Sequence, residues 1–400
     1  MPVIQIAEPR RQPSPPAAGR GLALWQLGFR PFYLAASLFA ALSIALWGLQ
    51  YAGALPQAYL NGPLWHAHEM LFGFVLAVIV GFLFTAGRNW TNQPTPTGGP
   101  LAALVLLWLA ARVLVLTPWG WAAAAANVAF PAAAAIALAV PFVRAGNRRN
   151  YFFVGLLLLL AAAAAWVHLG LLGVLPWPPM AGLQVALDAV LFIVSVMAGR
   201  VVPMFTNNGV RGAQATRQPW VEKAALGSVL ALLAADLLQA PAGLLAVIAA
   251  VGAVAHLWRW LLWQPWTTLR TPIVWVLHAA YLWVPVHLAL RAAAVLGWAS
   301  TSLATHALTV GAVGGMVIGM MTRTARGHTA RPLRADRADV ASYLLVLGAA
   351  LMRVLLPLLV PSLAYAAVLA SATLWSAGFG LYALRYWPVL TQPRLDGRPG

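Results

Sequence analysis

The sequence predicts an all-α, polytopic membrane protein of about twelve transmembrane helices. Three observations lead to this fold class: apolar residues make up 62% of the chain, charged residues make up only 8%, and the mean hydropathy is +0.80. A soluble domain carries roughly 25% charged residues, so this composition cannot cover a core with a surface that water tolerates. We therefore expect lipid as the solvent around the folded chain.

The positions of the twelve helices follow from the length of an apolar stretch, because a span needs about 20 mostly apolar residues. The stretches of that kind are 31–50, 64–87, 101–117, 121–143, 151–173, 180–203, 221–238, 241–263, 272–296, 302–322, 338–359 and 362–386. Clusters of Pro, Gly and polar residues, such as 94–99 and 175–179, separate them. The predicted organisation is one membrane domain over 25–390, between a disordered tail at 1–24 and a second tail at 391–400.

The distribution of cations predicts the orientation. Connections after even-numbered spans carry arginines such as Arg88, Arg144, Arg211 and Arg270, and connections after odd-numbered spans carry none. The positive-inside rule then places the charged connections and both tails in the cytoplasm. The net charge of +17 is explained by this topology, so we expect a lipid bilayer and no nucleic acid as partner.

Two absences narrow the chemistry. The chain has no cysteine, which excludes disulfides, thiolate ligands, iron–sulfur clusters and covalent c-type haem. Residues 1–20 lack the apolar stretch of a cleaved signal peptide, so we expect the first span to act as an uncleaved insertion signal.

A similar sequence ends every fourth helix. Spans two, six and ten end in Ala86-Gly87-Arg88-Asn89, Ala198-Gly199-Arg200 and Met321-Thr322-Arg323. This repeat predicts a pseudo-threefold ring of three four-helix units, a shape that resembles the main subunits of haem–copper oxidases. The resemblance concerns shape only, because the adjacent His-His pair of those subunits is missing. Gly-Arg is also a good cytoplasmic helix end, and this interpretation stays open.

Ionisable residues inside a bilayer are costly and mark candidate sites. At 1.5 Å per residue, four histidines and two carboxylates share an outer layer roughly 10 Å deep. The histidines are His66, His68, His168 and His306, and the carboxylates are Glu69 and Asp188. His66 and His68 are two residues apart and point about 200° apart on a helix, so one helix could serve two centres. Glu69 lies three residues after His66, on its face, where it could orient the imidazole or take a proton. The alternative is that both histidines merely lie among lipid headgroups.

Imidazole without thiolate suits haem iron, copper and zinc. We therefore expect a b-type haem with one or two axial ligands drawn from His66, His68, His168 and His306, and copper at the remaining histidines. Tyr281 lies one turn after His278, so this pair could be a ligand and proton relay, or His278 could be hydrogen-bonded across helices. We interpret His256 and His287 as structural.

Two sets of arginines are candidate anion-binding residues. Arg88, Arg200 and Arg323 share one depth at the inner helix ends, where they could bind haem propionates, lipid phosphates or a quinol headgroup, or simply anchor the helices. A second set, Arg112, Arg291 and Arg353, lies toward the outer side, and we expect it to pair with Asp188, Asp236 or propionates in the outer layer.

Several stretches resemble the NnrS family of denitrifying and related bacteria. They are Gly28-Phe29-Arg30-Pro31-Phe32, Trp65-His66-Ala67-His68-Glu69-Met70 continuing to Asn89-Trp90-Thr91, Gly199-Arg200-Val201-Val202-Pro203-Met204-Phe205-Thr206, His306-Ala307-Leu308 continuing to Arg326-Gly327-His328-Thr329, and Leu277-His278 with Tyr281 and Trp283. The similarity covers nearly the whole chain and adds His278 and His328 to the candidate metal ligands. It implies an inner-membrane protein containing haem and copper, tied to nitric oxide metabolism, denitrification or resistance to nitrosative stress.

The leading hypothesis is therefore a protein that binds or turns over nitric oxide near the periplasmic face, as an oxidoreductase or as a stoichiometric protector. Glu69 and Tyr281 are the candidate catalytic proton carriers. No motif indicates the electron donor, for which a quinol and a periplasmic cytochrome are both open. The alternatives are a twelve-helix secondary transporter for a metal or an anion and a haem-based membrane sensor.

Overall fold

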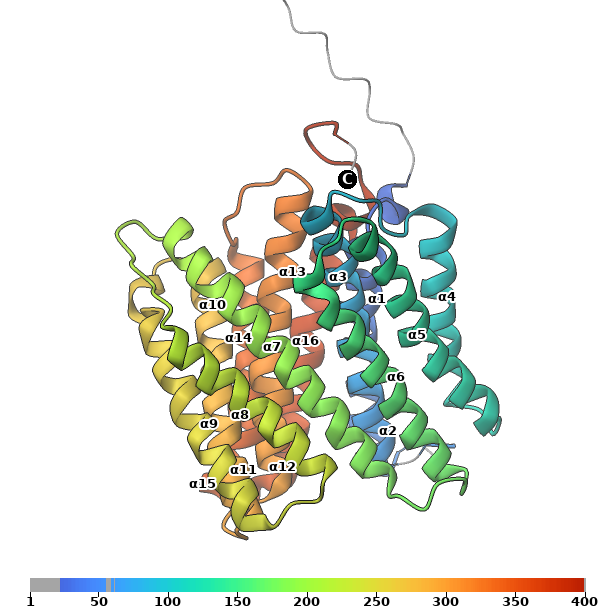
Figure 1. Cartoon of the computed structure of the whole chain (residues 1–400), viewed down its shortest axis with the longest axis vertical. Helices are drawn as coiled ribbons and strands as arrows, with labels where there is room; N and C mark the ends of the chain where they lie inside the picture. Colours follow the sequence, from blue (N-terminus) through green and yellow to red (C-terminus); the bar gives the residue numbers. More distant parts are fainter. Residues whose placement is uncertain (1–21, 55–58, 61, 399–400) are drawn as a thin grey trace, which may run out of the picture.

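The computed structural model describes residues 22–54, 59, 60 and 62–398, and over these residues the chain is helical without a strand. The helices form twelve segments that cross one bundle, which we number as spans one to twelve (Figure 1). Ten of them are long and apolar enough to cross a membrane. The other two are α4, which is too short, and α8, which carries Glu222, Lys223 and Asp236. The predicted all-α polytopic fold is confirmed.

The segments divide into three units of four spans. The first unit contains η1 (Ala23–Trp25), α1 (Phe29–Tyr51), a continuous helix made of α2 (Gly62–His68), η2 (Glu69–Val75) and α3 (Leu76–Thr91), then α4 (Gly98–Leu114) and α5 (Gly120–Arg144). The second contains η3 (Arg148–Asn150), α6 (Tyr151–Leu171), α7 (Pro179–Gly209), α8 (Pro219–Leu237) and α9 (Ala242–Leu262). The third contains η4 (Pro265–Thr268), α10 (Pro272–Tyr281), α11 (Trp283–Val295), α12 (Thr301–His306), η5 (Ala307–Gly314), α13 (Gly315–His328), α14 (Arg337–Ala350), η6 (Leu351–Leu355), α15 (Leu356–Leu359), η7 (Pro361–Leu363) and α16 (Ala364–Thr391).

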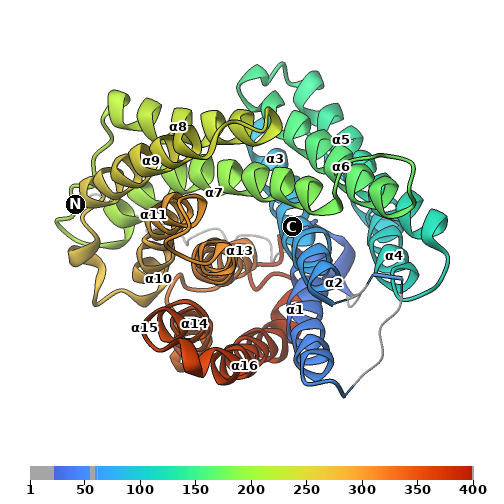
Figure 2. The ribbon, with the colours of Figure 1, turned by 90° about the horizontal axis from the view of Figure 1, so that it is seen from below.

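The three units close into a ring. The last helix of each unit packs extensively against the first span of the next: α5 against α6, α9 against α11, and α16 against α1. Spans two, six and ten, which end alike in a sequence with arginine, are 89%, 72% and 72% buried. Viewed along the bundle, α8 and α9 lie outside α7, and α13 lies near the centre (Figure 2). The repeat in the sequence therefore corresponds to the inner helix of each four-helix unit.

Local sequence explains where most helices begin and end. Spans six, seven and nine begin with proline at their first position, where its missing N–H is not needed. The long helix of span two ends at Asn92, whose φ of 51° is left-handed. The chain then turns through the 94–99 cluster that was predicted to separate two spans.

Three spans continue at least five residues past their predicted ends. Helix α7 continues past Pro203 to Gly209, α13 reaches His328, and α16 passes Pro388 to Thr391. A proline removes only one backbone hydrogen bond, and packed transmembrane helices tolerate this loss. The predicted ends at 203, 322 and 386 are therefore wrong, and the whole stretch 200–208 is helical. Residues 1–21 of the predicted N-terminal tail lie outside the described residues.

The two ends of the bundle differ in charge. The segment after α16 lies at the same end as the connections that carry Arg148, Arg211 and Arg331 (Figure 1). We call this the arginine-rich end. The opposite end carries α2, α12 and α15, and we call it the histidine end after His66, His68 and His306.

An ionic cluster fixes the start of α14 at the arginine-rich end. Asp336 Oδ1 accepts from the Asp339 N–H at 3.0 Å, and Asp339 Oδ2 accepts from the Asp336 N–H at 2.9 Å. The same Asp336 carboxylate lies 2.8 Å from Arg326 and 2.8 Å from Arg385. Burial raises the pKa of Asp336, but the hydrogen bonds from Asp339 and Arg385 and the charges of Arg385 and Arg326 outweigh it and lower the pKa to about 2.

This depressed pKa predicts an acid-sensitive stability. The folded pKa lies below the ordinary value of 3.8, so the stabilisation by Asp336 is complete above about pH 4 and is lost as the pH falls toward 2. In Asp336→Asn, which keeps a capping side chain, the unfolding temperature in detergent should fall less steeply over this window than in the wild type. Parallel curves for the two proteins would contradict the prediction.

Candidate functional site

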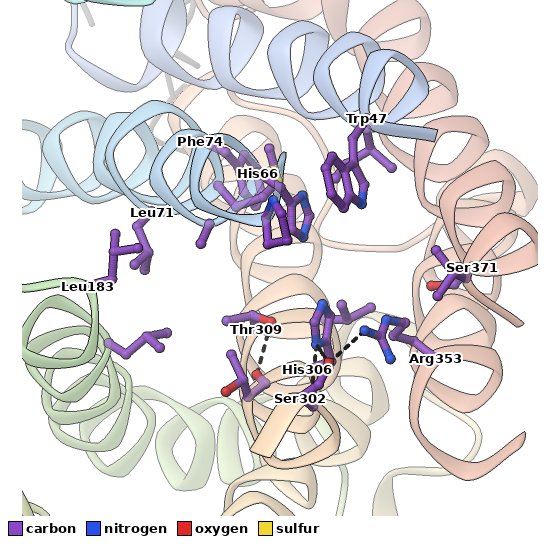
Figure 3. Close-up of a pocket in the computed structure, with 18 of the residues that line it drawn as sticks. Trp47, His66, Leu71, Phe74, Leu183, Ser302, His306, Thr309, Arg353 and Ser371 are labelled. Atoms are coloured by element: carbon purple, nitrogen blue, oxygen red, sulfur yellow. Dashed lines mark hydrogen bonds between the residues drawn. The ribbon is translucent and has the colours of Figure 1, made fainter. Parts of the chain in front are cut away.

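A cavity of about 450 Å³ lies at the histidine end, between spans one, two, six, ten, eleven and twelve. Its volume falls in the range of small-molecule and cofactor sites. Most of its wall is apolar, with side chains such as Leu71, Phe74 and Leu183 (Figure 3). A few polar groups converge on it, among them His66, His306 and Arg353.

Irregular helix geometry surrounds this cavity. The described chain contains three π-helical segments, η2, η5 and η6, and all three contribute lining residues: Phe74 from η2, Thr309 from η5 and Arg353 from η6. A π-helical turn gives up regular hydrogen bonding and is frequent at functional sites. Sequence reasoning missed this feature, because a π turn has no reliable composition signal.

His66 and His306 come from different spans and lie together in the cavity. Their ring centroids are 6.0 Å apart and their planes differ by 8°. Trp47 of α1 stacks on His66 with centroids 4.9 Å apart. Nδ1 of His306 lies 2.7 Å from the Ser302 carbonyl oxygen. Since a carbonyl only accepts, this Nδ1 carries the proton and Nε2 keeps its lone pair.

Arg353 provides a positive charge in the cavity wall. Its Nη2 donates to Ser302 Oγ at 2.8 Å, so Ser302 connects it to His306 (Figure 3). Within the described part of the chain no carboxylate forms an ion pair with Arg353. A partly buried guanidinium without a counter-charge favours an anionic group in the cavity.

The opposite face of span two carries a second histidine pair. Nε2 of His68 lies 3.1 Å from Nε2 of His168, and both side chains are fully buried. Glu69 Oε1 accepts from His68 Nδ1 at 2.8 Å and from Arg112 at 2.5 Å. Glu69 therefore fixes the proton of His68 on Nδ1, which leaves the lone pair of Nε2 directed at His168. Tyr59 Oη lies 3.3 Å from Nδ1 of His168.

This arrangement corrects two expectations. His66 and His68 do serve two different groups, but Glu69 contacts its neighbour His68 and not His66. The reason is Arg112 of α4, which binds both Glu69 and Asn127 and holds the carboxylate on the His68 face. Arg112 therefore pairs with Glu69, whereas Arg291 pairs with Asp188 and Asp236 as expected.

His278 and Tyr281 do not join either pair. Nε2 of His278 lies 2.8 Å from Thr206 Oγ1 on α7, which is the hydrogen bond across helices that the sequence left open. Tyr281 lies 2.6 Å from Nδ1 of His256 and accepts from Arg259 at 3.0 Å. Neither lines the cavity. His256 and His287 are bonded to carbonyl oxygens at 3.0 and 2.7 Å.

The candidate residues of the inner helix ends are far from the cavity. Arg88 is about 33 Å from His66 along one continuous helix. Arg200 donates to Asn150 at 2.8 Å, and Arg323 lies 3.6 Å above the ring of Phe205. Like these arginines, His328 lies at the arginine-rich end, where its ring packs near Phe29. None of the four can act on a ligand held by His66 and His306.

The four histidines of the predicted outer layer thus form two pairs, His66 with His306 and His68 with His168, and not one cluster. Over the described ranges, no group of three or more His, Asp or Glu side chains is placed to hold a metal ion. The two pairs share span two but lie on opposite faces of it, as the spacing of His66 and His68 predicts.

Fold and site together define a polytopic α-helical membrane protein with a histidine-lined cavity near one end of a twelve-span ring. A family model described as NnrS protein matches residues 23–394, and the chain belongs to this family. The resemblance inferred from the sequence is therefore confirmed. No curated protein matches the chain.

Proposed function

We propose that this protein is a haem- and copper-binding protein of the bacterial inner membrane that binds or turns over nitric oxide. Membership of the NnrS family supports a membrane protein related to nitric oxide. The observation that carries the finer proposal is the meeting of His66 and His306 in one apolar cavity beside the unpaired Arg353. The positive-inside rule favours a cytoplasmic arginine-rich end, and this supports a position of the cavity toward the periplasm.

The residues of the cavity fit a b-type haem. A haem needs an imidazole for its iron, an apolar slot and a cation near its propionates, and the cavity offers His306 or His66, an apolar wall and Arg353. His306 would be the first candidate to hold the haem iron, because a carbonyl holds its Nδ1 and leaves Nε2 as the donor atom. His66 is the second candidate, with its ring held by Trp47. When bound, haem supplies a redox-active iron that binds small gases.

The remaining residues shape the chemistry of the cavity. Arg353 would hold the haem propionates by charge and hydrogen bonding. The apolar side chains of Leu71, Phe74 and Leu183 exclude water and favour a small apolar gas such as nitric oxide. Ser302 bonds to both Arg353 and His306, so it fixes the anion-binding and ligating groups relative to each other.

The second pair fits copper. His68 and His168 present two imidazole nitrogens to one point, and imidazole suits copper where thiolate is missing. Glu69 bonds to the far nitrogen of His68, which is the carboxylate–histidine arrangement that orients a metal ligand. Tyr59 lies at the far nitrogen of His168, Nδ1, where it would orient this imidazole as Glu69 orients His68.

The test is the haem and copper content of purified protein. We expect the wild type to show a Soret band that shifts with nitric oxide. His66→Ala and His306→Ala should lose haem and keep copper, whereas His68→Ala and His168→Ala should lose copper and keep haem. The two pairs thus serve as controls for each other.

His278→Ala is the matched control outside both pairs, since His278 is buried like His68 and His168 but bonds to Thr206. It should keep both cofactors. Unchanged haem in both His66→Ala and His306→Ala would remove the cavity from the haem site. Transport would replace this proposal if the purified protein were colourless and metal-free and moved a metal or an anion into liposomes. The repeat of four spans differs from the six-helix halves of many transporters.

A further inference from the structure

A third polar group lies behind the cavity wall and takes no part in the proposed cofactor sites. Arg291 of α11 donates to Asp188 Oδ1 of α7 at 2.7 Å and to Asp236 of α8. Asp188 is 1% exposed and Asp236 is 14% exposed. Two carboxylates thus share one guanidinium, and we call Asp188 and Asp236 the aspartate pair.

The charges of this group do not balance. Two carboxylates and one guanidinium leave one negative charge, and Asp188 Oδ2 is buried without a hydrogen-bond partner in the described chain. A buried anion without compensation is costly, and the usual outcome is uptake of a proton. The other titratable group nearby is His287, four residues before Arg291, whose Nδ1 donates to the Ala304 carbonyl at 2.7 Å.

The group connects the protein surface to the cavity. Gln184 lines the cavity and donates its Nε2 to Asp188 Oδ1 at 3.1 Å. Gln184 precedes Asp188 by four residues in α7, so Asp188 lies one helical turn further along the same face of α7. Asp236 lies next to the end of α8, at the histidine end, where part of its side chain reaches the surface.

We propose that Asp188, Asp236 and Arg291 hold one exchangeable proton and deliver it from the surface at the histidine end to the cavity. The proton enters on the Asp236 carboxylate. It then moves to Asp188, breaking one carboxyl O–H bond and forming the other, and leaves toward the cavity past Gln184. Arg291 contacts both carboxylates and stays charged throughout.

This inference rests on the proposed function and extends it. Reduction of two nitric oxide molecules to nitrous oxide and water consumes two electrons, supplied by a quinol or a cytochrome, and two protons. An apolar cavity cannot store those protons, so a neighbouring acid has to provide them. The aspartate pair is placed to do so without contacting His66, His306 or the second histidine pair.

The first test is infrared spectroscopy, which separates the carbonyl stretch of a protonated carboxyl from that of a carboxylate. The wild type should show a protonated carboxyl at neutral pH that disappears at alkaline pH. Both Asp188→Asn and Asp236→Asn should lose this band, because the remaining carboxylate then has Arg291 to itself. No titrating band in the wild type, or the same band in both variants, would overturn the inference.

Glu222→Gln is the control, because Glu222 contacts two arginines, Arg217 and Arg259, and stays ionised. It should leave the band unchanged.

The second test is the reduction potential of the bound haem as a function of pH. Its pH dependence should weaken in Asp188→Asn, and an equal dependence in wild type and variant would refute delivery to the cavity. If no haem is bound, the proposed function fails while the infrared result still decides the proton site.

Discussion

Arg112→Leu should destabilise the protein by about 3–5 kcal/mol, because it leaves the buried charge of Glu69 without its partner. Glu69 is 1% exposed and Arg112 is 5% exposed, with 2.5 Å between Oε1 and Nη1. The same change should lower copper content, since Glu69 holds the tautomer of His68. Unfolding in detergent and metal analysis measure the two effects.

A double-mutant cycle isolates the pair. Glu69→Gln combined with Arg112→Leu should cost much less than the sum of the single changes, because neither partner then carries an unpaired charge. Arg144→Leu is the matched control, as Arg144 is exposed at a helix end; it should shift stability by no more than about 0.5 kcal/mol. If Arg112→Leu behaves like this control, the ion pair does not stabilise the fold.

Gly199→Ala should also be strongly destabilising. A Cβ at residue 199 would overlap the guanidinium of Arg259, which is 1% exposed. That guanidinium donates to the Ser195 carbonyl at 2.8 Å and to Glu222 at 2.8 and 2.5 Å. The added methyl therefore either displaces Arg259 from Glu222 or separates α7 from α9, and we expect a loss of about 3 kcal/mol.

The same substitution elsewhere should have the opposite sign. At Gly227 of α8 an added Cβ meets no atom within 4 Å, so Gly227→Ala should stabilise the helix by up to about 1 kcal/mol. Unfolding both variants in the same detergent compares identical chemical changes in two environments. A Gly199→Ala protein as stable as Gly227→Ala would show that the Arg259 network tolerates displacement.

The repeated helix endings show how far sequence reasoning reaches. Gly199-Arg200 was recognised as one of three similar endings, and its period of four helices matches the ring. The reason for the glycine was not visible, because Arg259 is 60 residues away in the chain and meets Gly199 only after α7 and α9 pack.

The sequence by itself determined the helical segments, which end of the bundle carries the arginines, and the position of each histidine along its helix, because hydropathy is local and a helix rises by a fixed 1.5 Å per residue. It also determined that His66 and His68 point apart. Only the tertiary structure decided that His66 meets His306, that His68 meets His168, and that Arg112 takes Glu69. Those choices depend on how each helix is rotated against its neighbours, and packing between distant segments sets that rotation.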